Sequence, residues 1–314
     1  MKVRFYTVII SLLICFSETN ADSNLNVVVS IKPFHSLVSG VMLGVASPEL
    51  LLRGNFSPHT YSLKPSDAKK LQYADLVFWG GEALEGFLAK PISSLSKNAE
   101  VFSILGINGL KLRFFSAESH IVKSEIFESY SNNLPKNKGT DLKAAVDPHI
   151  WLDPENAKVI TQKTVRILSD FDPENAQIFQ KNGEKIIFRL NELDQQLSSE
   201  MSEIPDRTYL VLHDAYQYFE SRYQLKSAGS ITLQLEHFLG VSRLRKVQKM
   251  IKTSNVRCIF TEPQYSQKLL KTLIKDTSVK KGILDPIGAN IPPGPELYFD
   301  LLKNLSISLK SCLN

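Results

Sequence analysis

Four residues that can bind a metal ion stand far apart in this chain of 314 residues. They are His59 in Ser-Pro-His-Thr-Tyr, His149 in Asp-Pro-His-Ile-Trp, His213 in Val-Leu-His-Asp-Ala and Asp285 in Ile-Leu-Asp-Pro. Three imidazoles and one carboxylate are a sufficient set of ligands for zinc. In finger or helix motifs the ligands lie close in sequence, whereas here only a folded cleft can bring them together.

The positions of these residues relative to the expected strands suggest where they meet. His59 follows the run Leu-Leu-Leu, His213 ends Tyr-Leu-Val-Leu, and Asp285 ends Gly-Ile-Leu. His149 follows a polar segment and lies just before an expected helix. Parallel sheets bind ligands beyond the carboxyl ends of their strands. Two candidates come from each half of the chain, so we expect the metal in a cleft between two domains.

The alternation of apolar runs with amphipathic segments indicates an α/β fold with mainly parallel sheets flanked by helices. We predict an N-terminal lobe over 22–171, a long rigid linker helix over 172–204 and a C-terminal lobe over 205–314. The stretch 116–143 is polar and rich in lysine and serine, and we interpret it as a surface loop of the first lobe. His120, the one histidine of that loop, is expected to be solvated.

The linker helix has clear signals of its own. Aspartate, proline and glutamate occur in that order at Asp153 and again at Asp172, and they are typical of helix starts. Apolar residues recur every three or four positions up to Ile204. We therefore predict one helix from Pro173 to Ile204, which Gly183 weakens or kinks near its start.

The N-terminus predicts export. Lys2 and Arg4 precede a mostly apolar run that is too short to span a membrane, and small residues up to Ala21 suit cleavage, so 1–21 is interpreted as a signal peptide. Lipid attachment at Cys15 would require a small residue just before it, and Leu-Leu-Ile argues against that. We expect a periplasmic, monomeric protein.

Charge and cysteine content narrow the function further. The formal net charge of +5 is weak evidence for a polyanionic partner, and aromatic residues do not alternate with the basic ones, so we expect no nucleic acid. After removal of the signal peptide, two cysteines remain, Cys258 and Cys312. In an oxidising compartment an even pair suggests a disulfide, the alternative being two free thiols.

Four further residues are ranked below the main candidates. His35 follows a strand and borders the cleft without being needed as a ligand, and His237 is interpreted as a surface or packing residue. Trp151 is expected in the core or the pocket wall. Glu262, after Cys-Ile-Phe-Thr, is a carboxylate that could orient a ligand imidazole, or else an unrelated helix cap or surface acid.

These motifs resemble a known family. Besides the histidine contexts, the matching segments are Leu-Lys-Pro-Ser-Asp at 63–67, Ala-Asp-Leu-Val-Phe-Trp at 74–79, His-Asp-Ala-Tyr-Gln-Tyr-Phe-Glu at 213–220, Thr-Glu-Pro-Gln at 261–264 and Leu-Asp-Pro-Ile-Gly-Ala-Asn-Ile at 284–291. The chain resembles the periplasmic substrate-binding proteins of high-affinity zinc ABC importers, the ZnuA type. The resemblance implies two lobes joined by one long helix, metal at their interface, and a disulfide where the two late cysteines lie.

The resemblance also bears on the metal. Manganese-binding relatives usually have a glutamate where this chain has His213, so the histidine resembles the zinc branch, and nitrogen-rich ligand sets suit zinc.

The chain departs from the family pattern in two places. The loop 116–143 lacks the histidine-rich composition of many zinc members, and Pro58 stands where some members have an acid. The fourth ligand is therefore Asp285 or water.

We therefore predict a non-enzymatic receptor that captures Zn²⁺ and hands it to a membrane permease. Its affinity should fall at low pH because the imidazoles must be neutral. One alternative is a manganese or iron receptor, or an adhesin, of the same fold. The other is a zinc hydrolase in which a metal-bound hydroxide is the nucleophile and Glu262 the general base.

Overall fold

The computed structural model describes residues 25–115, 146–204, 206–232, 241–253, 255–265, 271, 274–275 and 277–314. The predicted signal peptide, with Cys15, and the polar loop 116–143, with His120, lie outside these residues. His237 lies outside them as well. In the part of the chain that the structure describes, no helix combines the length and apolar character needed to cross a bilayer.

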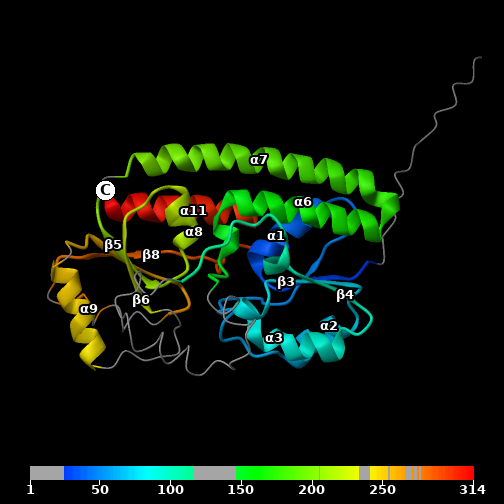
Figure 1. The fold of residues 1–314 in the computed structure, drawn as a ribbon, viewed down its shortest axis with the longest axis horizontal. Coiled ribbons are helices and arrows are strands. Elements are labelled where there is room, and N and C mark those ends of the chain that lie inside the picture. The colour runs from blue at the N-terminus through cyan, green and yellow to red at the C-terminus, as the bar shows by residue number, and fades with distance from the viewer. Residues whose placement is uncertain are drawn as a thin grey trace, which may run out of the picture.

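Two four-stranded parallel sheets form the centres of two lobes (Figure 1). The first has the order β2-β1-β3-β4 and the second β6-β5-β7-β8, so both sheets have the same topology. Every strand pair within them is parallel. The predicted fold class, two α/β lobes with mainly parallel sheets, is confirmed.

The first lobe is built as follows. Its strands are β1 Val27–Val29, β2 Glu49–Leu50, β3 Leu76–Trp79 and β4 Glu100–Ser103. Its helices are α1 Lys32–Val41, α2 Pro65–Gln72, α3 Glu82–Leu95 and α6 Pro154–Phe171, with short 3-10 turns at Ile104–Gly106 and Ile150–Leu152. The latter turn follows His149 directly. The Asp153 side chain accepts a hydrogen bond from Glu155 N and so caps α6, as the sequence predicts.

The second lobe is built around a deeply buried central strand, β5. Its strands are β5 Tyr209–His213, β6 Ser227–Thr232, β7 Cys258–Thr261 and β8 Lys280–Ile283. Its helices are α8 Gln217–Arg222, α9 Val241–Thr253 and α11 Leu297–Leu313. All five residues of β5 are buried.

Residues of β5 alternate between two separate clusters of buried apolar side chains. Tyr209 and Val211 pack in the main core, whereas Leu210 and Leu212 belong to a smaller cluster with residues of α9. Successive side chains of a strand point to opposite faces. His213 therefore projects from the same face as Tyr209 and Val211, toward the main core.

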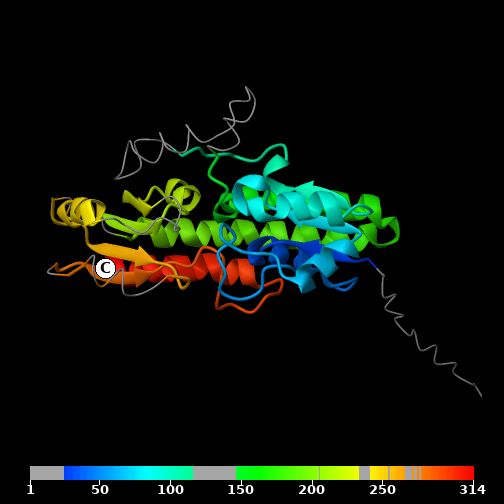
Figure 2. The ribbon, with the colours of Figure 1, turned by 90° about the horizontal axis from the view of Figure 1, so that it is seen from below.

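Helix α7, Ala176–Ser202, is 27 residues long and passes both sheets (Figures 1 and 2). It packs against α1, α6 and α11. Its buried face carries Phe179 and Gly183 and then the predicted apolar stripe of Ile186, Leu190, Leu193, Leu197 and Met201. The prediction of one helix from Pro173 to Ile204 is too long at both ends. A 3-10 turn over Pro173–Asn175 precedes α7, because Asp172 accepts a hydrogen bond from Asn175 N and closes that turn.

Helix α7 continues through Gly183 without interruption, and the expected weakening at this glycine stays a prediction. Gly183 lies on the buried face, where a Cβ atom would overlap Cγ2 of Val165 on α6. Glycine at this position lets the two helices approach closely, and the tertiary packing outweighs its lower helix propensity. The domain limits at 171/172 and 204/205 stay predictions.

A disulfide joins Cys258, at the start of β7, to Cys312, near the end of α11. The two Cα atoms are 6.2 Å apart and both residues are buried. The bond attaches the C-terminal helix to the second sheet, and the predicted pairing is confirmed.

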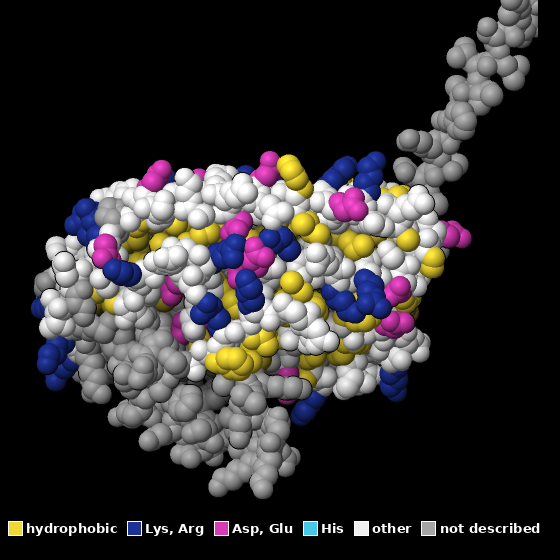
Figure 3. All heavy atoms as spheres, turned by 45° about the horizontal axis from the view of Figure 1, so that its top comes forward, with side chains coloured by type: hydrophobic (Ala, Val, Ile, Leu, Met, Phe, Trp, Pro, Cys, Tyr) yellow, Lys and Arg dark blue, Asp and Glu magenta, His cyan; other side chains and the backbone are white. Residues whose placement is uncertain are grey.

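The surface shown in Figure 3 mixes charges of both signs. Lysine and arginine side chains alternate with aspartate and glutamate across the described part of this face, and small apolar areas lie between them. Mixed charge of this kind gives the face no strong field of one sign.

Replacing Gly183 with alanine should lower the free energy of unfolding by about 1–3 kcal/mol, because the added methyl group overpacks the contact with Val165. The Val165→Ala change in the same chain should recover most of the loss. Gly86→Ala is a matched control: Gly86 lies in α3 with open space around its Cβ position, so alanine should be neutral or stabilising. Urea unfolding measures all four proteins, and a Gly183→Ala variant as stable as the wild type would contradict the close packing of α6 on α7.

The double variant Cys258→Ser/Cys312→Ser should lose roughly 4 kcal/mol of unfolding free energy, because the bond closes a loop of 54 residues. Urea unfolding with and without reductant measures the effect. Reductant should destabilise the wild type and leave the double variant unchanged. Two free thiols in the native protein, found by mass spectrometry without reduction, would contradict the prediction.

Candidate metal centre

His59, His149 and His213 come together between the two lobes. His59 lies in the loop between β2 and α2, His149 precedes the 3-10 turn at Ile150–Leu152, and His213 is the last residue of β5. One nitrogen of each imidazole lies within 4.8 Å of the corresponding nitrogens of the other two. His149 and His213 are buried, and His59 is half-buried.

The spacing of the imidazoles fits a tetrahedral ion. Nε2 of His59 and Nε2 of His149 are 3.3 Å apart. Two nitrogens bound to one zinc ion at about 2.0–2.1 Å in a tetrahedron are separated by about 3.3 Å. The three ring centroids are 5.0–5.3 Å apart with steep interplanar angles, so the rings are not stacked. The arrangement can present three nitrogen donors to one ion.

His149 is oriented by an aspartate that the sequence reasoning missed. Oδ1 of Asp147 lies 2.7 Å from Nδ1 of His149 and accepts a second hydrogen bond from the His149 backbone N–H at 3.0 Å. Both side chains are buried. This contact leaves Nε2 of His149 directed at His59. The signal available in the sequence was an acid two residues before the histidine, in Asp-Pro-His.

His213 has an equivalent partner in Glu262, the residue that follows β7. Oε1 of Glu262 lies 2.8 Å from Nδ1 of His213, and both side chains are buried. A carboxylate at Nδ1 fixes the tautomer and the ring orientation of a histidine, and leaves Nε2 as the donor atom for a metal.

His59 is held differently, by the loop around it. Its backbone N–H donates to Ser57 Oγ, and Thr60 N donates to the Ser57 carbonyl. The loop packs through Phe56 and Tyr61, whose rings meet edge to face. The two carboxylate contacts described above, from Asp147 and Glu262, are made to His149 and His213 and not to His59.

Burial and charge give the three imidazoles different protonation behaviour. Burial holds the pKa of His59 and of His149 well below the ordinary value, and the neighbouring histidines lower both further. Burial also lowers the pKa of His213, but the charge and hydrogen bond of Glu262 outweigh it, so that this pKa is raised. His213 is therefore the first of the three to protonate as the pH falls.

Buried carboxyl groups lie beside His149 and His213. Burial raises the pKa of Asp147 to about 8 and that of Asp214 to about 7, and the charge of Asp147 adds to the shift of Asp214. A positive ion nearby would favour the ionised forms. The site is therefore suited electrostatically to a cation.

The structure does not place Asp285 in the group of three histidines. Its Oδ1 accepts from Ile287 N at 3.2 Å and its Oδ2 from Ala289 N at 2.6 Å, so the carboxylate caps its own loop. Lys32 fixes the same loop by donating to the carbonyls of Gly288, Ala289 and Ile291. The role of Asp285 as a metal ligand stays a prediction.

His35 and Trp151 have other partners. His35 lies in α1, and its Nε2 is 3.0 Å from the Pro48 carbonyl, away from the three-histidine group. Trp151 is fully buried, as predicted, and its Nε1 donates to the Pro286 carbonyl of the other lobe. Its ring centroid is 5.3 Å from that of His149, so it forms part of the wall behind this histidine.

The fold and the site together define a class: two-lobed α/β proteins with a cluster of histidines at the interface that can hold a metal ion. Comparison with known proteins then gives the family. The chain belongs to the family described as zinc-uptake complex component A, periplasmic, whose model matches residues 27–312.

Curated relatives cover almost the whole chain. The high-affinity zinc uptake system protein ZnuA of Brucella suis biovar 1 (strain 1330) is 39% identical over 312 residues, which cover 92% of this chain and 91% of that protein. The protein of the same name from Yersinia pestis is 29% identical over 289 residues, with 91% of each chain covered.

Solved structures agree with the fold. A crystal structure of ZnuA superposes with a TM-score of 0.76 at 22% identity and covers 92% of this chain and 99% of that one. A zinc-bound deletion mutant of ZnuA gives 0.74 at 21% identity and covers 92% and 98%. At this level of identity the likeness establishes the fold alone.

Replacing Glu262 with glutamine should lower the pKa of His213, because burial remains when the stabilising charge of Glu262 is removed. NMR titration of the imidazole in the metal-free protein measures this shift. Glu100→Gln, at an exposed glutamate on β4, is the control and should leave it unchanged. If the titration of His213 is the same in Glu262→Gln and wild type, the two side chains are not in contact.

Proposed function

We propose that this protein is an exported, periplasmic receptor that binds one Zn²⁺ between its lobes and delivers it to the permease of an ABC importer. Nε2 of His59, His149 and His213 are the proposed ligand atoms. The observation that carries the proposal is the convergence of three imidazole nitrogens within 4.8 Å, from segments of both lobes. The names of the relatives, which are zinc uptake proteins, support the transport role.

The donor set favours zinc over the manganese and iron alternatives. All three grouped donors are imidazole nitrogens, and manganese prefers oxygen ligands. The 3.3 Å separation of the His59 and His149 nitrogens suits the short bonds of tetrahedral zinc. The nitrogen-rich set therefore supports the zinc branch.

The position of Glu262 argues against the hydrolase alternative. A general base must reach the proton that it removes. Oε1 of Glu262 is engaged by Nδ1 of His213, and the side chain is buried. It is therefore placed to orient an imidazole, and a receptor without catalytic activity is the better proposal.

The fourth ligand is either Asp285 or a water molecule. Both carboxylate oxygens of Asp285 accept backbone hydrogen bonds within its own loop. Ligation would require one of these bonds to be shared or exchanged. Water completes a three-histidine site without any such change.

Each lobe is proposed to supply part of the ligand set. Residues 22–171 would supply His59 and His149, residues 205–314 would supply His213, and the segment 172–204 would connect them as a stiff helix. We propose a monomer, with the permease as its partner. The stiffness of α7 limits the expected domain motion to a small tilt or a loop rearrangement.

Zinc should bind the wild type at one ion per chain, and His149→Ala/His213→Ala should reduce the affinity by several orders of magnitude because two of the three imidazole donors are lost. Competition against a chromophoric chelator measures the affinity, and native mass spectrometry gives the stoichiometry. His35→Ala is the matched control, a buried histidine outside the cluster, and it should keep wild-type affinity. Stoichiometric, tight zinc in the double variant would rule out the site, and manganese binding tighter than zinc would rule out the metal.

A further inference from the structure

The backbone just before His149 is paired with a distant segment of the same lobe. Phe114 and Val146 form an isolated antiparallel bridge, so Arg113 and Asp147 lie opposite each other. Asp147 N donates to the Arg113 carbonyl at 2.9 Å. In an antiparallel pair of this type, two opposed residues exchange two hydrogen bonds, and the second should run from Arg113 N to the Asp147 carbonyl.

A tyrosine hydroxyl from the other lobe occupies the place of that second bond. The hydroxyl of Tyr218 accepts from Arg113 N at 2.9 Å and donates to the Asp147 carbonyl at 2.8 Å. Tyr218 is 1% exposed. One hydroxyl thus joins both strands of the pair to α8 and sets the width of the pair at this point.

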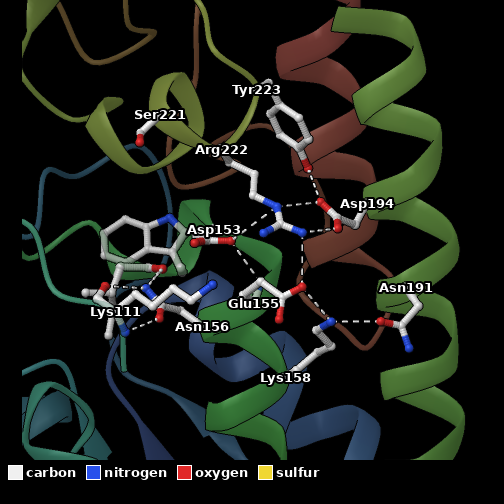
Figure 4. A network of polar contacts seen from close by, with 12 residues as sticks. Lys111, Asp153, Glu155, Asn156, Lys158, Asn191, Asp194, Ser221, Arg222 and Tyr223 are labelled. Atoms are coloured by element: carbon white, nitrogen blue, oxygen red, sulfur yellow. Dashed lines mark hydrogen bonds and ion pairs between the residues drawn. The ribbon is translucent and has the colours of Figure 1, made fainter. Parts of the chain in front are cut away.

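Arg222, the last residue of α8, and Tyr223, which follows it, fix the helix in place (Figure 4). Arg222 donates from Nε to Asp194 of α7 at 2.9 Å and from Nη2 to Glu155 of α6 at 3.0 Å. Tyr223, the residue after the helix, donates to the same Asp194 at 3.0 Å. Ion pairs and hydrogen bonds to two long helices make α8 a firm support for Tyr218.

Tyr218 also lies close in the sequence to a proposed metal ligand. Tyr218 follows His213 by only five residues, so one short segment carries a proposed zinc ligand and the support for a second. The contact runs from Tyr218 to the backbone of Asp147, and from the Asp147 carboxylate to Nδ1 of His149. The flank after His149 is held separately, by Asn156, whose Nδ2 donates to the carbonyls of Ile150 and Lys111.

We propose that Tyr218 is a positioning residue of the metal centre: its hydroxyl, inserted between Arg113 and Asp147, places the Asp147 carboxylate and so keeps Nε2 of His149 in register with His213. The proposal rests on the proposed zinc-binding function. Tyr218 does not contact the ion itself. Without the hydroxyl, the pair 113/147 can close to a direct hydrogen bond or admit a water molecule, and either change moves Asp147 relative to His149.

The test is Tyr218→Phe in the full mature chain, which removes the hydroxyl and keeps the ring. Removing a partner that orients a metal-bound histidine typically weakens metal affinity 10–100-fold. We therefore expect Tyr218→Phe to bind zinc about tenfold more weakly in chelator competition. A second measurement reports geometry: the visible absorption spectrum of the Co²⁺-loaded protein should change in band position or intensity. Imidazole NMR of the metal-free variant should show a shifted His149 resonance.

Tyr209→Phe is the matched control. Tyr209 is equally buried, and its hydroxyl donates to Glu220 within the second lobe at 2.9 Å, away from the His149 segment. It should lower the stability to urea by an amount comparable to Tyr218→Phe, yet keep the zinc affinity and the Co²⁺ spectrum of the wild type. This separates positioning from a loss of stability.

The outcomes distinguish this inference from the proposed function. If His149→Ala keeps wild-type zinc affinity, the proposed site itself is wrong. If His149→Ala loses zinc but Tyr218→Phe keeps both the wild-type affinity and the wild-type Co²⁺ spectrum, the site stands and the role of Tyr218 is overturned. Loss of affinity with an altered spectrum in Tyr218→Phe, and neither change in Tyr209→Phe, supports the role.

Discussion

The structure depends on holding three imidazole nitrogens close together inside the protein, two of them on rings whose protonated form burial disfavours. Burial lowers the proton affinity of His59 and His149, and each buried imidazole must still point its free nitrogen at one place. The carboxylates of Asp147 and Glu262 meet this second need by binding Nδ1 of their respective histidines. Each lobe supplies one such pair, so orientation of the donors is built into both halves of the site.

Keeping donors from two lobes at ångström spacing requires a rigid frame. Helix α7 passes both sheets and packs on helices of each lobe. Gly183 allows α6 to lie close against it, and Arg222 attaches α8 to both α6 and α7. Elements packed this tightly move as units, because interiors at crystal-like density resist deformation. Contacts that are remote from the histidines therefore add to the precision that Asp147 and Glu262 give the site directly.

The sequence predicted much of this because its signals are local. Strand-like runs alternating with amphipathic segments predicted the two α/β lobes, and the cap at Asp153 and the stripe on α7 follow from periodicity and side-chain chemistry. Propensity describes an isolated helix and therefore could not reveal that Gly183 allows the close packing of α7 on α6. The two sheets have the same strand order, although the sequence shows no matching internal repeat.

The sequence by itself determined which residues can bind zinc, since only histidine, cysteine and the acidic residues offer suitable donors and few stand at expected strand ends. Tertiary structure decided how they are used. It brought His59 to His149 across 90 residues, Glu262 to His213 across 49 and Tyr218 to Asp147 across 71. A hydrogen bond requires correct distance and angle between atoms, and for residues far apart in the chain these are set only when the whole fold has formed.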